Sequence, residues 1–172
     1  MKSLFIVANW KSNKNESEAV AYLSQFSTGY ENNEEKKVII CPSFPQLLTL
    51  SSFIKNNNLD IEVGAQTVSH FEEGPFTGEV NAKQLHGLVS YCIVGHSERR
   101  QEFSEESAMI NDKINLLLKE GIRPIVCVSQ MSQVEELSRD FSDLIIAYEP
   151  LASIGSGHPQ DPDAADAFSK QV

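Results

Sequence analysis

Apolar positions along the chain fall into short runs that are separated by longer segments of mixed polarity. Six of these runs are rich in Val and Ile: Leu4–Asn9, Val38–Cys41, Ile61–Ala65, Tyr91–Gly95, Ile125–Val128 and Leu144–Glu149. Within them apolar residues are nearly continuous and do not alternate with polar ones. That pattern is typical of strands that are buried on both faces of a parallel sheet. The sequence therefore predicts six parallel strands.

A segment with helical patterning follows each run. The predicted helices are Asn15–Ser27, Pro45–Asn56, Asn81–Leu88, Ser104–Glu120, Ser132–Phe141 and Asp163–Gln171. The fourth has the clearest ends, because Ser104 or Ser107 can cap its start and Gly121 can end it. Glu105 there suits the positive end of the helix dipole. Six β-α units in succession favour parallel strands joined by right-handed crossovers, in one α/β domain over residues 1–172.

Composition and charge narrow the classes of partner. A length of 172 residues with 41% hydrophobic side chains suits a single globular domain. Lys and Arg total 14 against 24 Asp and Glu, a formal net charge of -10, which disfavours nucleic acid and anionic membranes as partners. An anionic substrate would need a local positive potential. No run approaches the roughly 20 apolar residues of a membrane span, and the N-terminal run is shorter than the core of a signal peptide, so we expect a cytoplasmic protein.

The cysteines and the lack of known cofactor motifs indicate no disulfide framework and no bound cofactor. Cys41, Cys92 and Cys127 each lie inside an apolar run, show no CxxC spacing and are odd in number. We therefore expect buried, reduced thiols and no disulfide framework. The sequence contains no cluster with metal-ligand spacing, no glycine-rich nucleotide loop and no GxSxG motif. It indicates no metal and no organic cofactor.

Polar side chains gather where the predicted strands end. Asn9 and Lys11 close the first run, Gln66 follows the third, His96 follows the fourth and Glu149 ends the sixth. The carboxyl ends of parallel strands meet at one edge of the sheet, where active sites of α/β proteins are found. We therefore expect an amide, a lysine, a histidine and a carboxylate to meet at this edge.

Glu149 is the candidate general base. It ends an apolar run and precedes Pro150, so partial burial would make its carboxylate a better base near neutral pH. The alternative is an ordinary solvated glutamate at a strand end. The segment from Pro150 through Ile154, Gly155, Ser156 and Gly157 resembles a lid that presents backbone N–H groups to an anion.

His96 and Lys11 are the candidate partners of that base. His96 precedes an expected helical turn, which favours a neutral imidazole able to donate a hydrogen bond to a carbonyl oxygen; the alternative is a structural histidine. Lys11 could supply the local positive charge for a phosphate or carboxylate; the alternative is plain solvation. Arg99 and Arg100 are candidates for ion pairs with Glu98 or another acid, or for phosphate ligands. Together these groups suit proton abstraction next to a carbonyl in a small phosphorylated substrate, through an enediolate.

Five motifs in order along the chain resemble the triosephosphate isomerase family. They are Ala8-Asn9-Trp10-Lys11, Gly64-Ala65-Gln66, the segment Gly74–Glu79, the segment Val94–Arg100 with its Gly-His-Ser-Glu-Arg-Arg, and Tyr148-Glu149-Pro150 with Ile154–Gly157. The resemblance implies a TIM (β/α) barrel and the interconversion of dihydroxyacetone phosphate and glyceraldehyde 3-phosphate. A different sugar-phosphate isomerase on the same fold is a further alternative.

The resemblance also implies roles for individual residues. Glu149 would carry the proton between two substrate carbons, His96 would polarise the carbonyl, Lys11 would offset phosphate and enediolate charge, and Asn9 would orient the substrate. The backbone at Gly155 would grip the phosphate as the lid closes. A homodimer that acts on a small phosphorylated triose is implied as well.

Two features of the resemblance concern the dimer and the barrel. Thr77, at the tip of the loop after the third strand, would reach the neighbouring subunit's site. The family's barrel has eight β-α units, of which we expect about six in this chain, with the last two lacking. The sequence also departs from the family at Ala152, where a Trp is usual, and at Ser129-Gln130, where Gly-Glu is usual. The alternative to an active isomerase is therefore an incomplete barrel, an assembly module that needs a partner chain for the last strands.

Overall fold

The computed structural model describes residues 4–33, 35–153 and 159–172. In chain order the elements are β1 Leu4–Asn9, α1 Glu16–Gly29, β2 Lys36–Cys41, the 3-10 turn η1 Phe44–Gln46, α2 Leu47–Asn56, β3 Ile61–Ala65, α3 Ala82–Leu85, β4 Tyr91–Val94, α4 Ser97–Glu102, α5 Ser107–Lys119, β5 Arg123–Val128, α6 Met131–Glu135, β6 Ile145–Tyr148 and α7 Pro162–Ser169. All six predicted strands are present, with ends that differ by two residues or fewer.

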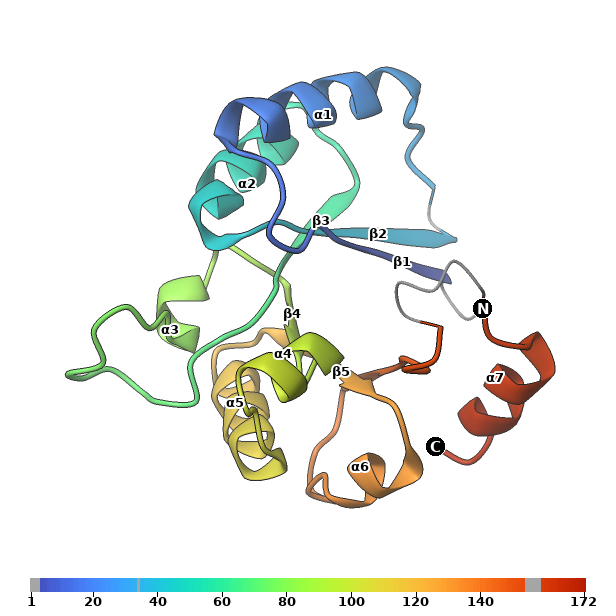
Figure 1. Ribbon diagram of the computed structural model, residues 1–172. Coiled ribbons are helices and arrows are strands. Elements are labelled where there is room, and N and C mark those ends of the chain that lie inside the picture. The colour runs from blue at the N-terminus through green and yellow to red at the C-terminus, as the bar shows by residue number, and fades with distance from the viewer. Residues whose placement is uncertain (1–3, 34, 154–158) are drawn as a thin grey trace.

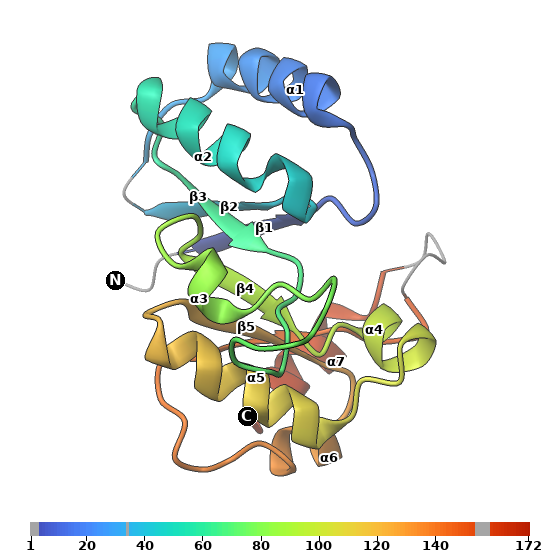
Figure 2. The same ribbon diagram turned by 90° about the vertical axis from the view of Figure 1, so that its left-hand side faces the viewer.

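The six strands form one parallel sheet in the order β1-β2-β3-β4-β5-β6. The sheet curls, with α1 and α2 outside its first three strands and α5 outside β4 and β5 (Figures 1 and 2). The prediction of a partial TIM barrel is confirmed as a curled half-barrel whose strands alternate with helices. Because every strand runs in the same direction, the segments after the strands all lie at one edge of this sheet.

Two apolar clusters cover the two faces of the sheet. The larger one joins strands to helices through residues such as Leu23, Leu50 and Ile114. The smaller one contains Ile39, Cys41, Tyr91, Ile93, Ile125 and Cys127, all from strands. The three cysteines are free and buried, as predicted. Burial raises the pKa of all three thiols, that of Cys41 to about 12.

Strands β1 and β4 differ sharply in burial. All four residues of β4 are buried, whereas in β1 Leu4 is 57% exposed and Ile6 is 44% exposed. Strand β1 pairs with β2 along its whole length. Within the described residues no strand pairs with its other edge. A parallel strand with one unpaired edge and apolar side chains in solvent is a ready surface for another strand.

The helices depart from prediction more than the strands do. Helix α5 begins at Ser107 with Glu106 as its N-cap, so Ser104 is not a cap and Glu105 lies outside the first turn. Ser104 has a φ of 52°, a left-handed conformation that cannot continue into a helix. Gly121 follows the end of α5 with a φ of 70°, as expected for a helix-terminating glycine.

Helices α3 and α6 are shorter than expected, with four and five residues. Helix α4 has six residues and lies where only a helical turn was expected. No helix in the described part of the chain is long and apolar enough to cross a membrane.

Candidate active site

The carboxyl ends of β1, β3 and β4 surround a hollow of about 230 Å³. Asn9, Lys11 and His96, three of the predicted site residues, line it together with Gln66 and Glu98. The fourth, Glu149, follows β6, where its backbone N–H donates to the Val128 carbonyl at 2.7 Å. Strand β6 is at the opposite end of the strand order from β1, and the Glu149 carboxylate that follows it contacts His96. The curl of the sheet thus brings together residues that are up to 140 positions apart in the chain.

The imidazole of His96 lies between a backbone donor and the candidate base. Its Nδ1 accepts a hydrogen bond from the Glu98 N–H at 3.2 Å. Because that N–H can only donate, a neutral ring carries its proton on Nε2. Nε2 lies 3.2 Å from Oε1 of Glu149. His96 is therefore held as a donor that points at the carboxylate.

Glu149 is mostly buried, with its side chain 21% exposed. Its other oxygen, Oε2, accepts a hydrogen bond from the backbone N–H of Ser97 at 3.2 Å. Both carboxylate oxygens are thus held by groups at the start of α4. The Cys127 thiol forms a side-chain hydrogen bond with the same carboxylate, so Glu149 is held from both β5 and α4.

Lys11 is fixed by its backbone and by its side chain. Its φ of 53° lies in the left-handed region, and its N–H donates to Oδ1 of Asn9 at 3.0 Å. Its Nζ forms an ion pair with Oε1 of Glu98 at 2.5 Å. Lys11 is therefore placed in the hollow by a defined set of contacts and is not simply solvated.

Gly95 and Arg100 join the ends of β4 and β5. Gly95 has a φ of 66°, and an added Cβ would lie 2.9 Å from the Arg100 guanidinium, so glycine is required before His96. Arg100 donates from Nε to the Gly95 carbonyl at 2.8 Å and from Nη2 to the Cys127 carbonyl at 3.4 Å. Burial lowers the pKa of the Arg100 guanidinium.

Arg99 does not pair with Glu98 but with Glu105, Nε to Oε2 at 2.6 Å. Lys113 contacts the same carboxylate oxygen at 2.9 Å, and both Lys113 and Glu105 are almost completely buried. Glu105 also accepts from the Gly95 N–H at 3.3 Å. Burial acts to raise the pKa of Glu105, but Lys113 and Arg99 outweigh it and hold that pKa below its ordinary value. This charged cluster supports the turn that carries His96.

The proposed lid and dimer loop are described only in part. Pro150 begins a turn in which the Ser153 N–H donates to its carbonyl at 2.9 Å. The predicted lid residues Ile154, Gly155, Ser156 and Gly157 lie outside the described residues. Thr77 is exposed in the loop that projects beyond α3 (Figure 1). The roles given to these residues therefore stay predictions.

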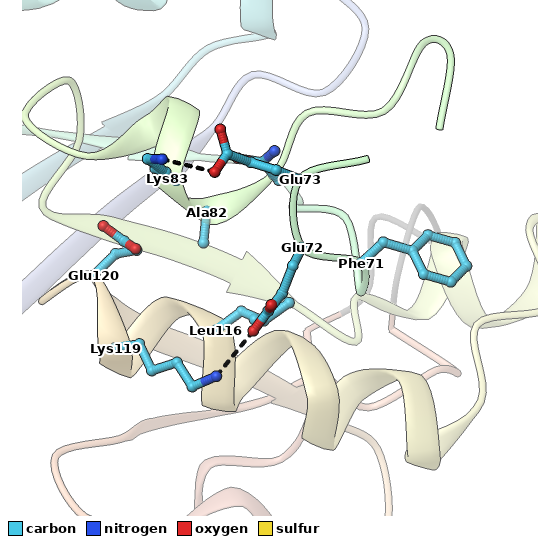
Figure 3. Close-up of a pocket in the computed structure, with 9 residues that line it drawn as sticks. Phe71, Glu72, Glu73, Ala82, Lys83, Leu116, Lys119 and Glu120 are labelled. Atoms are coloured by element: carbon cyan, nitrogen blue, oxygen red, sulfur yellow. Dashed lines mark hydrogen bonds and ion pairs between the residues drawn. The ribbon is translucent and has the colours of Figure 1, made fainter. Parts of the chain in front are cut away.

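Figure 3 shows a second hollow, of about 380 Å³, between α3, α5 and the loop that carries Phe71. Its charged side chains form ion pairs, Lys83 with Glu73 at 2.7 Å and Lys119 with Glu72 at 3.0 Å. It shares no lining residue with the first hollow. Its third carboxylate, that of Glu120, lies 3.4 Å from Nδ1 of His86. No histidine in the described part of the chain lines this hollow, so it offers no counterpart to the histidine and carboxylate of the candidate site.

Three further residues help to hold the site together. The sequence places Gln66 at a strand end and offers Glu98 as an ion-pair partner of an arginine, but it does not predict their contacts with Lys11. Ser97, whose N–H contacts Glu149, is not a candidate in the sequence. All three lie in segments directly after a strand, which is the signal that found the other candidates.

No group of three or more His, Cys, Asp or Glu side chains in residues 4–33, 35–153 and 159–172 is placed to hold a metal ion.

Comparisons with known proteins identify the family of this chain. The family model described as Triosephosphate isomerase matches residues 4–172. A protein of Treponema denticola named triosephosphate isomerase is 34% identical over 100% of this chain and 76% of its own length. One of Aquifex aeolicus with the same name is 35% identical over 93% of this chain and 72% of its own. One of Dehalococcoides mccartyi is also 35% identical, over 91% and 68%. The chain belongs to the triosephosphate isomerase family.

Proposed function

We propose that this chain interconverts dihydroxyacetone phosphate and glyceraldehyde 3-phosphate by proton transfer through an enediolate. The contact between His96 and Glu149 carries the proposal. The Glu98 N–H donates to Nδ1 of His96. The proton of a neutral ring is then on Nε2, which lies 3.2 Å from Oε1 of Glu149. A hydrogen-bond donor and a base at this spacing can act on the carbonyl oxygen and on the adjacent C–H of one small substrate.

The chemistry balances without any added reactant. The Glu149 carboxylate takes a proton from the carbon beside the carbonyl, and the C–H electron pair moves to form the enediolate. Nε2–H of His96 donates to the oxygen on which negative charge develops. Glu149 then returns its proton to the neighbouring carbon. The hydroxyl proton of the first carbon passes to the former carbonyl oxygen, with Nε2 of His96 giving one proton and taking the other back, so the carbonyl moves by one position. Because the substrate and the two side chains supply every proton, we expect no metal and no organic cofactor.

Lys11 and Asn9 would bind and orient the anionic substrate. The chain carries a formal net charge of -10, so a phosphate needs a local cation. The Lys11 ammonium in the hollow meets that need. We propose that the backbone at Gly155 adds a further phosphate contact as the lid closes. We also propose that the active form is a homodimer in which Thr77 contacts the other subunit's site.

The test is replacement of the base. Glu149→Gln removes the proton acceptor with little change in size, and Glu149→Asp withdraws it from the substrate. Either change is expected to lower kcat about 10²- to 10⁴-fold, the usual contribution of general acid–base catalysis. Glu135→Gln, at an exposed position on α6, is the matched control and should keep normal turnover. Near-normal kcat in Glu149→Gln would contradict the assignment.

We propose as an alternative that the chain is an assembly module, inactive alone, to which a partner chain adds strands. The exposure of Leu4 and Ile6 on the unpaired edge of β1 favours this role. The size of the active species decides between the two functions. Turnover that elutes with a particle containing one or two copies of this chain alone would contradict the partner-dependent function. Turnover that appears only in a larger complex with another protein would support it.

A further inference from the structure

The loop between β1 and α1 contains two lysines in a left-handed backbone conformation. Lys11 has a φ of 53° and Lys14 a φ of 68°. Residues with a Cβ rarely adopt this conformation, and it persists only where surrounding contacts hold it. Each of the two lysines is therefore expected to be held by specific contacts.

A glutamine from another element contacts each lysine in the same way. Nε2 of Gln66, just after β3, donates to the Lys11 carbonyl at 2.9 Å. Nε2 of Gln46, at the end of η1, donates to the Lys14 carbonyl at 3.1 Å. The two contacts have the same chemistry, but only Lys11 enters the candidate site. Lys14 instead lies over the rings of Trp10 and Tyr22.

Gln66 differs from Gln46 in its second contact: Oε1 of Gln46 accepts from the Ser43 hydroxyl within its own segment, whereas Gln66 reaches another strand. Its amide nitrogen also donates to the Cys41 carbonyl at 2.8 Å, so one side chain joins the ends of β1, β2 and β3. The Lys11 N–H is taken by Asn9. The peptide groups on both sides of the Lys11 Cα are thus fixed, which sets the direction in which its long side chain leaves the backbone.

We propose that Gln66 is a positioning residue for Lys11. It does not need to touch the substrate; its amide holds the backbone turn from which the Lys11 ammonium reaches the hollow beside Glu98. Without the amide donors, Lys11 relaxes toward a commoner backbone conformation and its ammonium leaves the position where it meets the phosphate. This inference rests on the proposed function, since it assigns Gln66 to the same site.

The experiment compares Gln66→Met with Gln46→Met in the full chain. Both changes keep the length of the side chain and remove an amide that donates to a lysine carbonyl. Gln66→Met is expected to lower kcat/KM by about 10- to 100-fold, the effect of a displacement of about 1 Å in a positioned group, chiefly through KM. Gln46→Met is expected to stay within about twofold of the wild type. Equal losses in the two variants would overturn the proposal, because they would reflect a general weakening of the loop.

A double-variant cycle tests whether Gln66 acts through Lys11. If it does, Lys11→Ala combined with Gln66→Met is no less active than Lys11→Ala alone. Fully additive losses would overturn the proposal. Should Gln66→Met fail to fold, Gln66→Asn enters the same cycle, since its shorter amide cannot reach both carbonyls.

A measurement without turnover separates this inference from the proposed function. Hydrogen exchange of the Lys11 amide, which is bonded to Asn9, is expected to be at least about tenfold faster in Gln66→Met than in the wild type, with no such change in Gln46→Met. Unchanged exchange would overturn the role of Gln66 whatever the activity. A wild type that holds the Lys11 amide as described but shows no isomerase turnover would overturn the proposed function alone.

Discussion

Strands β4 and β1 position His96 and Lys11, one on each side of the candidate site, by different kinds of contact. His96 follows a strand whose four residues are all buried, and the turn around it rests on the buried cluster of Glu105, Arg99 and Lys113. Lys11 follows a strand with apolar residues in solvent. Its N–H donates to Oδ1 of Asn9, and its carbonyl accepts from Nε2 of Gln66, which follows β3.

This difference separates two ways of making a site rigid. Around β4, burial and charge pairing fix the backbone, so the imidazole needs only a local contact with the Glu98 N–H. Around β1, packing is incomplete, and individual hydrogen bonds to main-chain groups replace it. We therefore expect changes near β4 to affect folding first, and changes near β1 to affect the site with little effect on folding.

The largest expected effect is at the buried cluster. Glu105→Gln leaves Lys113 and Arg99 without a counter-charge, which costs about 3 kcal/mol or more of unfolding free energy. Denaturant unfolding at neutral pH measures this loss. A loss below about 1 kcal/mol would show that the cluster does not support the β4 region.

The Glu105→Gln variant also tests how the unfolding free energy depends on pH. The pKa of Glu105 in the folded chain lies below its ordinary value, so its charge stabilises the fold above the unfolded pKa of about 4.3. That stabilisation is lost as the pH falls through the lower, folded pKa. The difference in unfolding free energy between wild type and Glu105→Gln should therefore shrink on acidification below about pH 4.3. A difference that stays constant down to pH 3 would contradict the role of the carboxylate charge.

A smaller change in unfolding free energy is expected when one isoleucine in each of the two strands is truncated to alanine. Ile93 in β4 is 3% exposed and Ile6 in β1 is 44% exposed. Ile93→Ala is expected to cost about 2–4 kcal/mol because it leaves a cavity, and Ile6→Ala less than about 1 kcal/mol. Thermal and denaturant unfolding of both variants measure the contrast. Equal costs would mean that another chain covers β1 in solution, which would favour the assembly module.

The strands were predictable because each is a local, nearly continuous apolar run. Their ends were less so: β5 begins at Arg123 and not at Ile125, since Arg123 pairs with Tyr91 of β4. The start of α5 was predicted wrongly for a related reason. An acidic residue such as Glu105 is typical of a helix start, but its carboxylate turns inward to the buried Lys113 and the partly buried Arg99. No short-range pattern in the sequence indicates such partners.

The site residues were predictable as a set, because they all follow strands of one parallel sheet. Their pairing was not. Lys11 and Glu98 are 87 positions apart, and only the curl of the sheet decides that Glu98 faces Lys11 and not Arg99. The hydrogen bonds from Gln66 were hidden for the same reason, since a glutamine after a strand carries no signal of which carbonyl it will reach.

The bond from Gln66 to Lys11 has a consequence for the order in which the chain acquires its working shape. It spans 55 positions, and the contact between Lys11 and Glu98 spans 87. Closing such long loops carries an entropic cost that is met only once the intervening strands have docked. During synthesis the segment bearing Lys11 emerges first, yet we expect it to take up its left-handed turn only after β3 has docked. We expect its ammonium to meet Glu98 later still, when β4 and α4 have formed, so that the part of the site made earliest is completed among the last.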